Sequence, residues 1–260
     1  MHILLTNDDG IFAPGLAAIC KKLNTLEDTE VTVAAPADSQ SGASHSITYK
    51  SPLICNHINV NDLFTGYSIQ GSPADCVKLA FLQLTDKPID LVVSGINNGA
   101  NTGINVYYSG TVAAAMEAAF LKIPSIAMSL ACDEPMDFAQ AGEYCFKILK
   151  KLIPIIKSGD VFNINVPRLS EGTPRGLKIA PQSTKGFHEE YIPKQGEDGK
   201  TVFQLAGGPH HPENNHTDTT SLVEGYITLT ALVCGMTHSK RNTELAESGK
   251  FDEKSVREIL

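Results

Sequence analysis

The chain has 260 residues, of which 42% are apolar and 19% charged, and its formal net charge is −8. This length allows one large domain or one domain with an appendage. The acidic balance and the lack of a basic cluster exclude a general binder of nucleic acid polymers or membrane surfaces. No apolar stretch reaches the ~20 residues of a transmembrane helix. A strand expected from residue 2 leaves no room for a signal peptide, and six cysteines without a C-x-x-C pair indicate reduced thiols, so we expect a cytoplasmic protein.

Short apolar runs alternate with helical patterns through the first 170 residues. The expected strands span residues 3–5, 30–36, 89–95, 124–130 and 161–167, and the expected helices begin at residues 14, 73, 112 and 138. This alternation predicts βαβ units, and therefore an α/β fold with a mostly parallel, Rossmann-like sheet between two helical layers. Residues 47–68 are expected to form irregular or hairpin β structure.

The pattern changes after about residue 170. The expected strands there lie at residues 177–179, 202–205 and 225–234, with a short helix at 252–260. We therefore divide the chain into an α/β core, residues 1–170, and a β-rich C-terminal extension, residues 171–260. An arm or hairpin of this extension is expected to reach a partner subunit.

Polar side chains follow three of the expected strands at the points where the strands end. The residues concerned are Asn7, Asp8 and Asp9, then Ser39, Ser41 and Ser44, then Asn97, Asn98 and Asn101. Ligands of open α/β sheets bind at the carboxyl ends of the strands. Adjacent carboxylates repel each other unless a cation or strong donors compensate, and Mg²⁺ prefers carboxylate, carbonyl and water oxygens. The pattern predicts a divalent metal site; helix capping, the alternative, explains one acidic residue but not a pair.

Ser109, Gly110 and Thr111 precede an alanine-rich helix and form a candidate phosphate site. Helix N-termini attract anions, and glycine permits their close approach. His45, in the serine-rich loop, is a candidate for proton transfer or substrate contact; the alternative is a loop histidine bonded to the backbone. Histidines 210, 211 and 216 match no standard zinc spacing. Dinucleotide, P-loop and nucleophile-elbow motifs are absent from the sequence.

With these features in place, the sequence closely resembles the SurE family of nucleotide phosphatases over nearly its whole length. The motifs that carry the resemblance are ILLTNDDG (3–10), SGAS (41–44), GSPADCV (71–77), VSGINNGANTG (93–103), SGTVAAA (109–115), NINVP (163–167) and GYITLT (225–230). The resemblance implies release of phosphate from nucleoside 5′-monophosphates, with 3′-nucleotides, other phosphomonoesters or polyphosphate as further substrates. It also implies a cytoplasmic homodimer or homotetramer with exchanged C-terminal segments.

The resemblance selects Ser41 among the loop serines. It implies one divalent cation per subunit, Mg²⁺ or Mn²⁺, held by Asp8, Asp9, Ser41 and Asn97, with the two aspartates and Asn97 as catalytic residues. The residues expected to contact the phosphate or the rest of the substrate are Asn7, Gly42, His45, Asn101, Ser109, Gly110 and Thr111.

Two questions stay open at the level of sequence. The nucleophile is either a water activated by the cation or one of the two aspartates. The alternative functions are a receiver-like phosphorylation switch, which would need a further aspartate where the chain has Asn97, and an assembly protein that works through residues 185–260.

Overall fold

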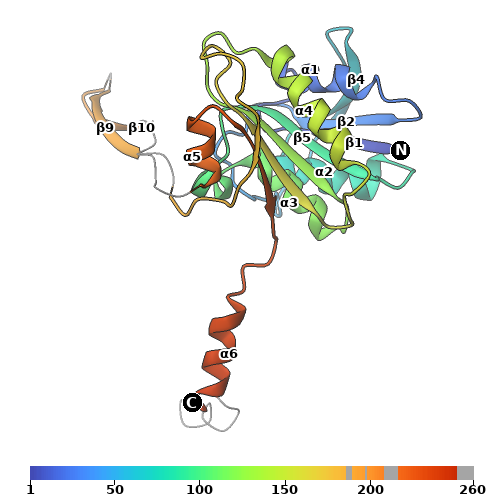
Figure 1. Ribbon diagram of the computed structural model, residues 1–260. Coiled ribbons are helices and arrows are strands. Elements are labelled where there is room, and N and C mark those ends of the chain that lie inside the picture. The colour runs from blue at the N-terminus through green and yellow to red at the C-terminus, as the bar shows by residue number, and fades with distance from the viewer. Residues whose placement is uncertain (186–188, 197, 208–215, 251–260) are drawn as a thin grey trace.

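The computed structural model describes residues 1–185, 189–196, 198–207 and 216–250, and nine strands of this part form one mixed sheet (Figure 1). In spatial order the strands are β3 (Cys55–Val60), β4 (Phe64–Ile69), β2 (Glu30–Pro36), β1 (His2–Thr6), β5 (Leu91–Asn98), β6 (Ser125–Leu130), β7 (Val161–Val166), β11 (Ile227–Leu232) and β8 (Leu177–Ile179). All neighbours from β4 to β7 are parallel, while β3 and β11 pair antiparallel with β4 and β7. The predicted α/β fold with a mostly parallel sheet is confirmed.

Helices cover both faces of the sheet. The four main helices are α1 (Pro14–Leu23), α2 (Pro73–Leu79), α3 (Gly110–Phe120) and α4 (Phe138–Leu152). Successive side chains of a strand point to opposite faces. Ile3 and Leu5 of β1 accordingly pack in the core that holds α1 and α4, whereas Leu4 packs in the core that holds α2 and α3. This places β1, which is buried on both faces, at the centre of the molecule.

The start of α2 shows how the sequence determines an element. Ser72 Oγ accepts a hydrogen bond from the backbone N–H of Asp75 at 3.1 Å, and Asp75 Oδ2 accepts one from the backbone N–H of Ser72 at 2.9 Å. This capping box, with Pro73 in the first turn, satisfies donors that the helix itself leaves free. The expected helix begins where predicted and reaches Leu84 as expected, but its last part, η1 (Ala80–Leu84), is a π-helical turn.

The C-terminal part is divided between the sheet and two projections. Strands β8 and β11 extend the central sheet beyond β7. In Figure 1 the hairpin of β9 (Glu189–Gln195) and β10 (Thr201–Gly207) and the helix α6 (Ser239–Glu247) extend away from the body. The sequence did not predict β9, α6 or the short helix α5 (Asp218–Val223), and the helix expected at 252–260 lies outside the described residues. The division at residue 170 and the role of the extension in oligomerisation stay predictions.

No helix in the described part of the chain combines the length and the apolar character that crossing a bilayer requires.

Candidate active site

The carboxylates that follow β1 lie beside the end of β5. Strands β1 and β5 are hydrogen-bonded neighbours, with Thr6 opposite Ser94. The turn that follows β1 therefore lies close to the end of β5. The backbone N–H of Asn98 donates a hydrogen bond to Asp9 Oδ2 at 2.9 Å. Two of the three strand ends that were predicted to cooperate are thus in direct contact.

The N-terminus of α3 lies against Asp8. The hydroxyl group of Thr111 donates a hydrogen bond to Asp8 Oδ1. A Cβ atom added to Gly110 would lie 2.8 Å from the Cβ of Asp8, closer than such atoms approach, so this contact requires a glycine. Ser109 caps the helix by accepting from the backbone N–H of Val112 at 3.1 Å. The candidate phosphate site and the acidic pair are therefore adjacent in the structure.

Burial makes both carboxylates costly to ionise. Desolvation is the main reason that the pKa of Asp8 rises from 3.8 to about 6; hydrogen bonding from Thr111 opposes this rise, and the charge of Asp9 adds to it. The pKa of Asp9 is also raised by desolvation, and its hydrogen bond from Asn98 opposes the shift. A bound cation would relieve both penalties, because it would favour the charged carboxylates.

The serine-rich loop passes over the turn that carries Asp8. The backbone N–H of Gln40 donates to the carbonyl oxygen of Asp8 at 2.7 Å, which fixes the loop to the end of β1. Ser41 is exposed, and its hydroxyl lies 3.1 Å from that of Ser39. Gly42 has a φ of +74° and open space around its Cα, so the chain turns here in a conformation that favours glycine.

The three predicted asparagines have different surroundings. Asn97 is partly buried, and its amide nitrogen donates to the carbonyl oxygen of Gly99 at 2.7 Å, which leaves the amide oxygen as its possible cation ligand. Asn7 donates to the carbonyl oxygen of Gly10 at 2.9 Å, and its buried Oδ1 has no hydrogen-bond partner within the described structure. Asn101 is buried, and its amide nitrogen donates to Ser129 Oγ at 2.9 Å. Asn97 and Asn7 thus bond to the turns that follow their own strands, whereas Asn101 bonds to Ser129 of β6.

His45 is held by a carboxylate rather than by the backbone. Its Nε2 lies 2.8 Å from Oε2 of Glu117, a residue of α3. His216 is exposed, and His210 and His211 lie outside the described residues. The described residues contain no group of three or more His, Cys, Asp or Glu side chains that could hold a metal ion. The predicted ligand set is of another kind, since it joins two carboxylates to a serine and an asparagine.

Two cavities are each lined by one residue that is hydrogen-bonded to the acidic turn. One, of about 460 Å³, is lined by residues of the serine-rich loop, including Gln40, and by the start of α2. The other, of about 670 Å³, is lined by Asn98 and by loops after β6 and β7, including Cys132 and Arg168. Gln40 is hydrogen-bonded to the main-chain carbonyl of Asp8, and Asn98 to the carboxylate of Asp9, but neither aspartate lines either cavity.

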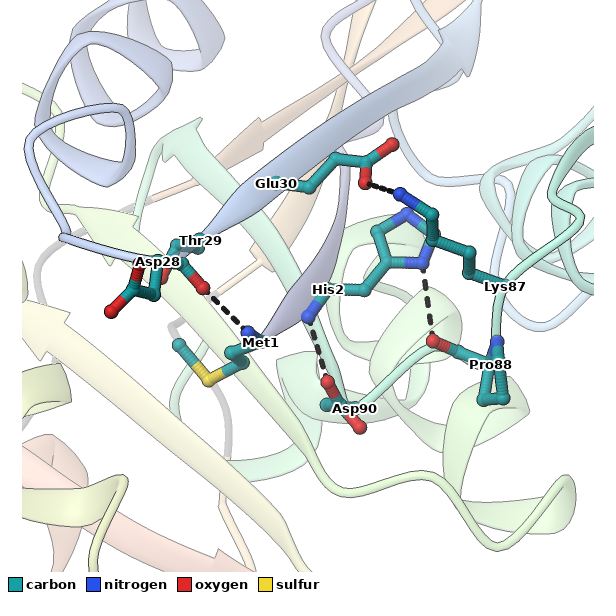
Figure 2. Close-up of a pocket in the computed structure, with 8 residues that line it drawn as sticks. All are labelled: Met1, His2, Asp28, Thr29, Glu30, Lys87, Pro88 and Asp90. Carbon is teal, nitrogen blue, oxygen red and sulfur yellow. Dashed lines mark hydrogen bonds and ion pairs between the residues drawn. The ribbon is translucent and has the colours of Figure 1, made fainter.

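A third cavity, of about 610 Å³, lies at the opposite end of the sheet and is not a candidate (Figure 2). Its polar groups satisfy one another: the backbone N–H of His2 donates to Asp90 Oδ2 at 2.7 Å, and Lys87 pairs with Glu30. It lies at the amino ends of β1 and β2, away from the edge where ligands of such sheets bind.

Sequence reasoning missed two buried carboxylates near the site. Glu117 is 4% exposed and contacts both His45 and Lys78. Asp218 is fully buried and accepts hydrogen bonds from the backbone N–H groups of Gly103 at 3.0 Å and Ser183 at 2.8 Å. The available signal for Glu117 was a single acidic residue in an otherwise apolar helix. Asp218 lies in a segment for which the sequence predicted no helix.

The fold and the site together define an α/β protein with an acidic pair at the carboxyl edge of its sheet, facing a helix N-terminus. Comparison with known proteins agrees with this description. The family model described as "Survival protein SurE" matches residues 3–189. The chain belongs to the SurE family.

Similar proteins cover nearly the whole chain. The "5′-nucleotidase SurE" of Rhodopirellula baltica is 42% identical over 250 residues, which are 95% of this chain and 98% of that protein. The protein of the same name from Syntrophobacter fumaroxidans is 38% identical and covers 92% of this chain and 95% of its own length. The crystal structure of the SurE protein from Aquifex aeolicus has a TM-score of 0.79 and 35% identity, and covers 96% of this chain and 98% of that one.

Proposed function

We propose that the chain is a divalent-metal-dependent 5′-nucleotidase that hydrolyses nucleoside 5′-monophosphates to nucleoside and inorganic phosphate. The observation that carries the proposal is the contact between Asp8 and the N-terminus of α3 through Gly110 and Thr111. It brings an anion-binding helix end to a pair of carboxylates that need a cation. The names of the similar proteins from Rhodopirellula baltica and Syntrophobacter fumaroxidans support the same activity.

The donor set fits one hard divalent cation per subunit, Mg²⁺ or Mn²⁺. Asp8 and Asp9 are carboxylates whose pKa values burial raises, and the amide oxygen of Asn97 points away from its own hydrogen bond. Ser41, in the loop fixed to Asp8 by Gln40, would complete the set. When bound, the cation would neutralise phosphoryl oxygens and lower the pKa of a water molecule.

The residues of the chain would divide the remaining work. Ser109, Gly110 and Thr111 would bind the phosphoryl oxygens with the Ser109 hydroxyl and with backbone N–H groups at the start of α3, where the helix dipole favours negative charge. The hydroxyl hydrogen of Thr111 is donated to Asp8. One of the two aspartates would also take part in the reaction itself. It would either take the proton of the attacking water or attack phosphorus itself.

Acid quenching of a single turnover with radiolabelled phosphate in AMP distinguishes these two routes. Attack by an aspartate predicts label retained on the protein as an acyl phosphate. Attack by water predicts that all label is released as inorganic phosphate. A phosphoprotein that forms without any turnover would instead support the receiver-like switch.

Broader specificity and assembly form part of the proposal. The two polar cavities lined by Gln40 and by Asn98 would leave room for substrates other than 5′-nucleotides, including 3′-nucleotides, other phosphomonoesters and polyphosphate. We infer a cytoplasmic homodimer or homotetramer in which the hairpin β9–β10 and helix α6 contact other subunits. These subunit contacts are supported by exposed apolar side chains of the hairpin, Tyr191, Phe203 and Leu205, and by the lack of any buried residue in α6.

The decisive experiment measures phosphate release from a panel of nucleotides with Mg²⁺, Mn²⁺ or a chelator. We expect metal-dependent release from AMP, and we expect Asp8→Asn and Asp9→Asn each to abolish it in folded protein. Asp90→Asn is the matched control, because Asp90 accepts a backbone hydrogen bond at the other end of the sheet. Full activity of both site variants in chelator would exclude the metal mechanism.

A further inference from the structure

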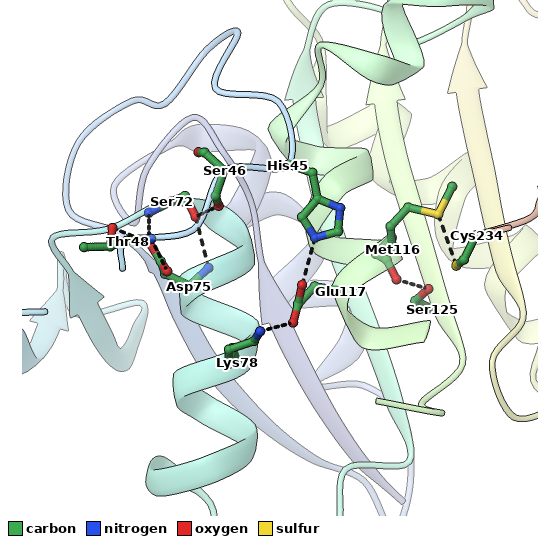
Figure 3. Close-up of polar contacts among 11 residues, drawn as sticks. His45, Ser46, Thr48, Ser72, Asp75, Lys78, Met116, Glu117, Ser125 and Cys234 are labelled. Atoms are coloured by element: carbon green, nitrogen blue, oxygen red, sulfur yellow. Dashed lines mark hydrogen bonds and ion pairs between the residues drawn. The ribbon is translucent and has the colours of Figure 1, made fainter. Parts of the chain in front are cut away.

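Glu117 is a buried carboxylate between two positively charged or protonatable partners (Figure 3). It lies on α3, six positions after Thr111, and its two oxygens contact His45 Nε2 at 2.8 Å and Lys78 Nζ at 2.9 Å. Burial would raise the pKa of Glu117, but the hydrogen bonds from His45 and Lys78 bring it below its ordinary value. The carboxylate is therefore paired, as a buried charge must be.

The two partners of Glu117 come from different parts of the fold. Lys78 belongs to α2, which packs beside α3, so this pair joins two helices of one layer. His45 belongs to the serine-rich loop, and its ring also stacks on Phe120 of α3 at a centroid distance of 5.3 Å. The side chain of His45 therefore fastens the loop to the helix whose first turn carries Thr111.

The rest of the loop is attached through hydrogen bonds at both sides of His45. Ser44 donates its backbone N–H to the carbonyl oxygen of Tyr108 at 3.1 Å. The carbonyl oxygen of Ser46 accepts from Ser72 Oγ at 2.6 Å, and Thr48 donates its backbone N–H to Asp75 Oδ1 at 2.9 Å (Figure 3). The segment from Ser39 to Gly42, by contrast, is mostly exposed. Within this segment one backbone hydrogen bond, from Gln40 to the carbonyl oxygen of Asp8, holds the chain over the acidic turn, and His45 adds an attachment on the C-terminal side of Ser41.

We propose that Glu117 is a positioning residue, which holds His45 and thereby keeps the loop that carries Ser41 in place over the Asp8–Asp9 pair. The inference rests on the proposed function, because it gives Ser41 a role as a cation ligand. In this arrangement His45 acts as a fastening group, since its Nε2 is used by the carboxylate. The helix α3 then has two functions: its first turn faces the phosphate, and its second half positions the loop opposite.

Lys78 provides the matched control. It contacts the same carboxylate as His45, but it lies on α2 and does not touch the loop through any hydrogen bond or ion pair within the described structure. Lys78→Met removes one partner of Glu117 and leaves the His45 contact. His45→Ala does the reverse and leaves Glu117 paired with Lys78, so this variant is expected to fold. His45→Gln places an amide nitrogen at the position of Nε2 and can restore the hydrogen bond.

The test uses two measurements on the full-length protein that do not require catalysis. Hydrogen–deuterium exchange of the metal-free protein reports the protection of backbone amides at residues 37–48. Calorimetric titration with Mn²⁺ reports the dissociation constant. We expect His45→Ala and Glu117→Ala to accelerate exchange in this segment and to weaken Mn²⁺ binding about five- to tenfold, the scale of one ordinary net hydrogen bond.

The expected pattern is specific. The Mn²⁺ dissociation constant of His45→Gln should stay within about twofold of the parent value, and Lys78→Met should leave residues 37–48 protected from exchange. The double variant His45→Ala/Glu117→Ala should bind Mn²⁺ no more weakly than the weaker of its two single variants. Unchanged exchange in His45→Ala would overturn the proposal, and so would equal loosening by Lys78→Met. Exchange is measured without metal or substrate and therefore tests the fastening role by itself. If the parent protein had no nucleotidase activity but His45→Ala still loosened the segment, the proposed function would be refuted and the fastening role would stand.

Discussion

Thr111 donates its hydroxyl hydrogen to the carboxylate of Asp8, across 103 positions of sequence. This hydrogen bond joins the end of the first strand to the first turn of α3, and it lowers the pKa that burial raises. It is the most direct evidence that the acidic pair and the helix N-terminus form a single site. It also makes Thr111 a residue whose replacement should change both the charge of Asp8 and the binding of phosphate.

We expect Thr111→Val to reduce phosphate release from AMP by about tenfold or more, because Asp8 loses the hydrogen bond that favours its charged form. Valine has nearly the shape of threonine, so the packing of α3 is preserved. Loss of the hydroxyl should also raise the pKa of Asp8 further and move the acidic limb of the pH–rate profile upward. Thr111→Ser retains the hydroxyl and is the control. A pH–rate profile of Thr111→Val that coincides with that of the parent would contradict this role.

The pH dependence of stability without metal follows from the pKa of Asp8. Its value in the folded protein, about 6, is above the ordinary 3.8. The folded state therefore binds this proton more tightly, and the associated stability is present below pH ~4 and lost as pH rises through ~6. The difference amounts to about 3 kcal/mol. Asp9, whose pKa is also raised, acts in the same direction.

Asp8→Asn should consequently be more stable than the parent protein at pH 8 in chelator, and this advantage should shrink toward pH 4. Asparagine keeps an oxygen that can accept from Thr111, so the change removes the charge while preserving the contact. Urea denaturation at both pH values measures the effect. Saturating Mn²⁺ should reverse the order at pH 8, because only the parent protein retains both carboxylates. Equal stability at pH 8 in chelator would mean that burial does not penalise Asp8.

The sequence predicted those parts of the fold and site that depend on local pattern. Buried strands, the Ser72–Pro73 helix start and the polar residues after β1 and at the end of β5 were all visible as short motifs. Contacts between distant segments were not visible. The pairing of Glu117 with His45 and Lys78 depends on how α2 and α3 pack, and the parallel neighbours β1 and β5 are separated by nearly ninety positions. The choice of Ser41 came from resemblance to a family and stays a prediction.

Gly110 should be intolerant of a side chain. An added Cβ would lie 2.8 Å from the Cβ of Asp8 and 3.0 Å from Cγ of Pro73, so Gly110→Ala must displace the carboxylate. Overpacking of this kind costs about 1–3 kcal/mol, and we expect activity to fall further than stability alone would explain. The measurements are the free energy of unfolding and the rate of phosphate release.

Gly142→Ala in α4 is the matched control for Gly110→Ala. Its Cβ would meet the carbonyl oxygen of Ala18 at 3.7 Å, which is ordinary contact. Alanine is preferred to glycine inside a helix by roughly 0.5–1 kcal/mol, so this variant should be at least as stable as the parent and fully active. If Gly110→Ala were equally well tolerated, the close approach of α3 to Asp8 would not matter for catalysis.

The last prediction concerns Asp218, which connects the C-terminal part to the loop after Asn97. Its carboxylate accepts from the backbone N–H groups of Gly103 and Ser183, and from that of Thr219 at 2.7 Å. Asp218→Ala leaves these buried donors without a partner, which costs about 1–3 kcal/mol for each group. We expect a large loss of stability, together with weaker Mn²⁺ binding, because the loop from Asn97 to Gly103 loses its attachment.

Asp137 separates this effect from simple helix capping. Its carboxylate caps α4 by accepting from the backbone N–H of Gln140 at 2.9 Å, at an exposed position. Asp137→Ala should cost about 1 kcal/mol and leave both Mn²⁺ affinity and phosphate release unchanged. Asp218→Asn, which keeps one acceptor oxygen, should fall between Asp218→Ala and the parent protein. Should Asp218→Ala bind Mn²⁺ as tightly as the parent, α5 would serve the fold alone; weaker binding would mean that the C-terminal part helps to hold Asn97, the proposed metal ligand, in place.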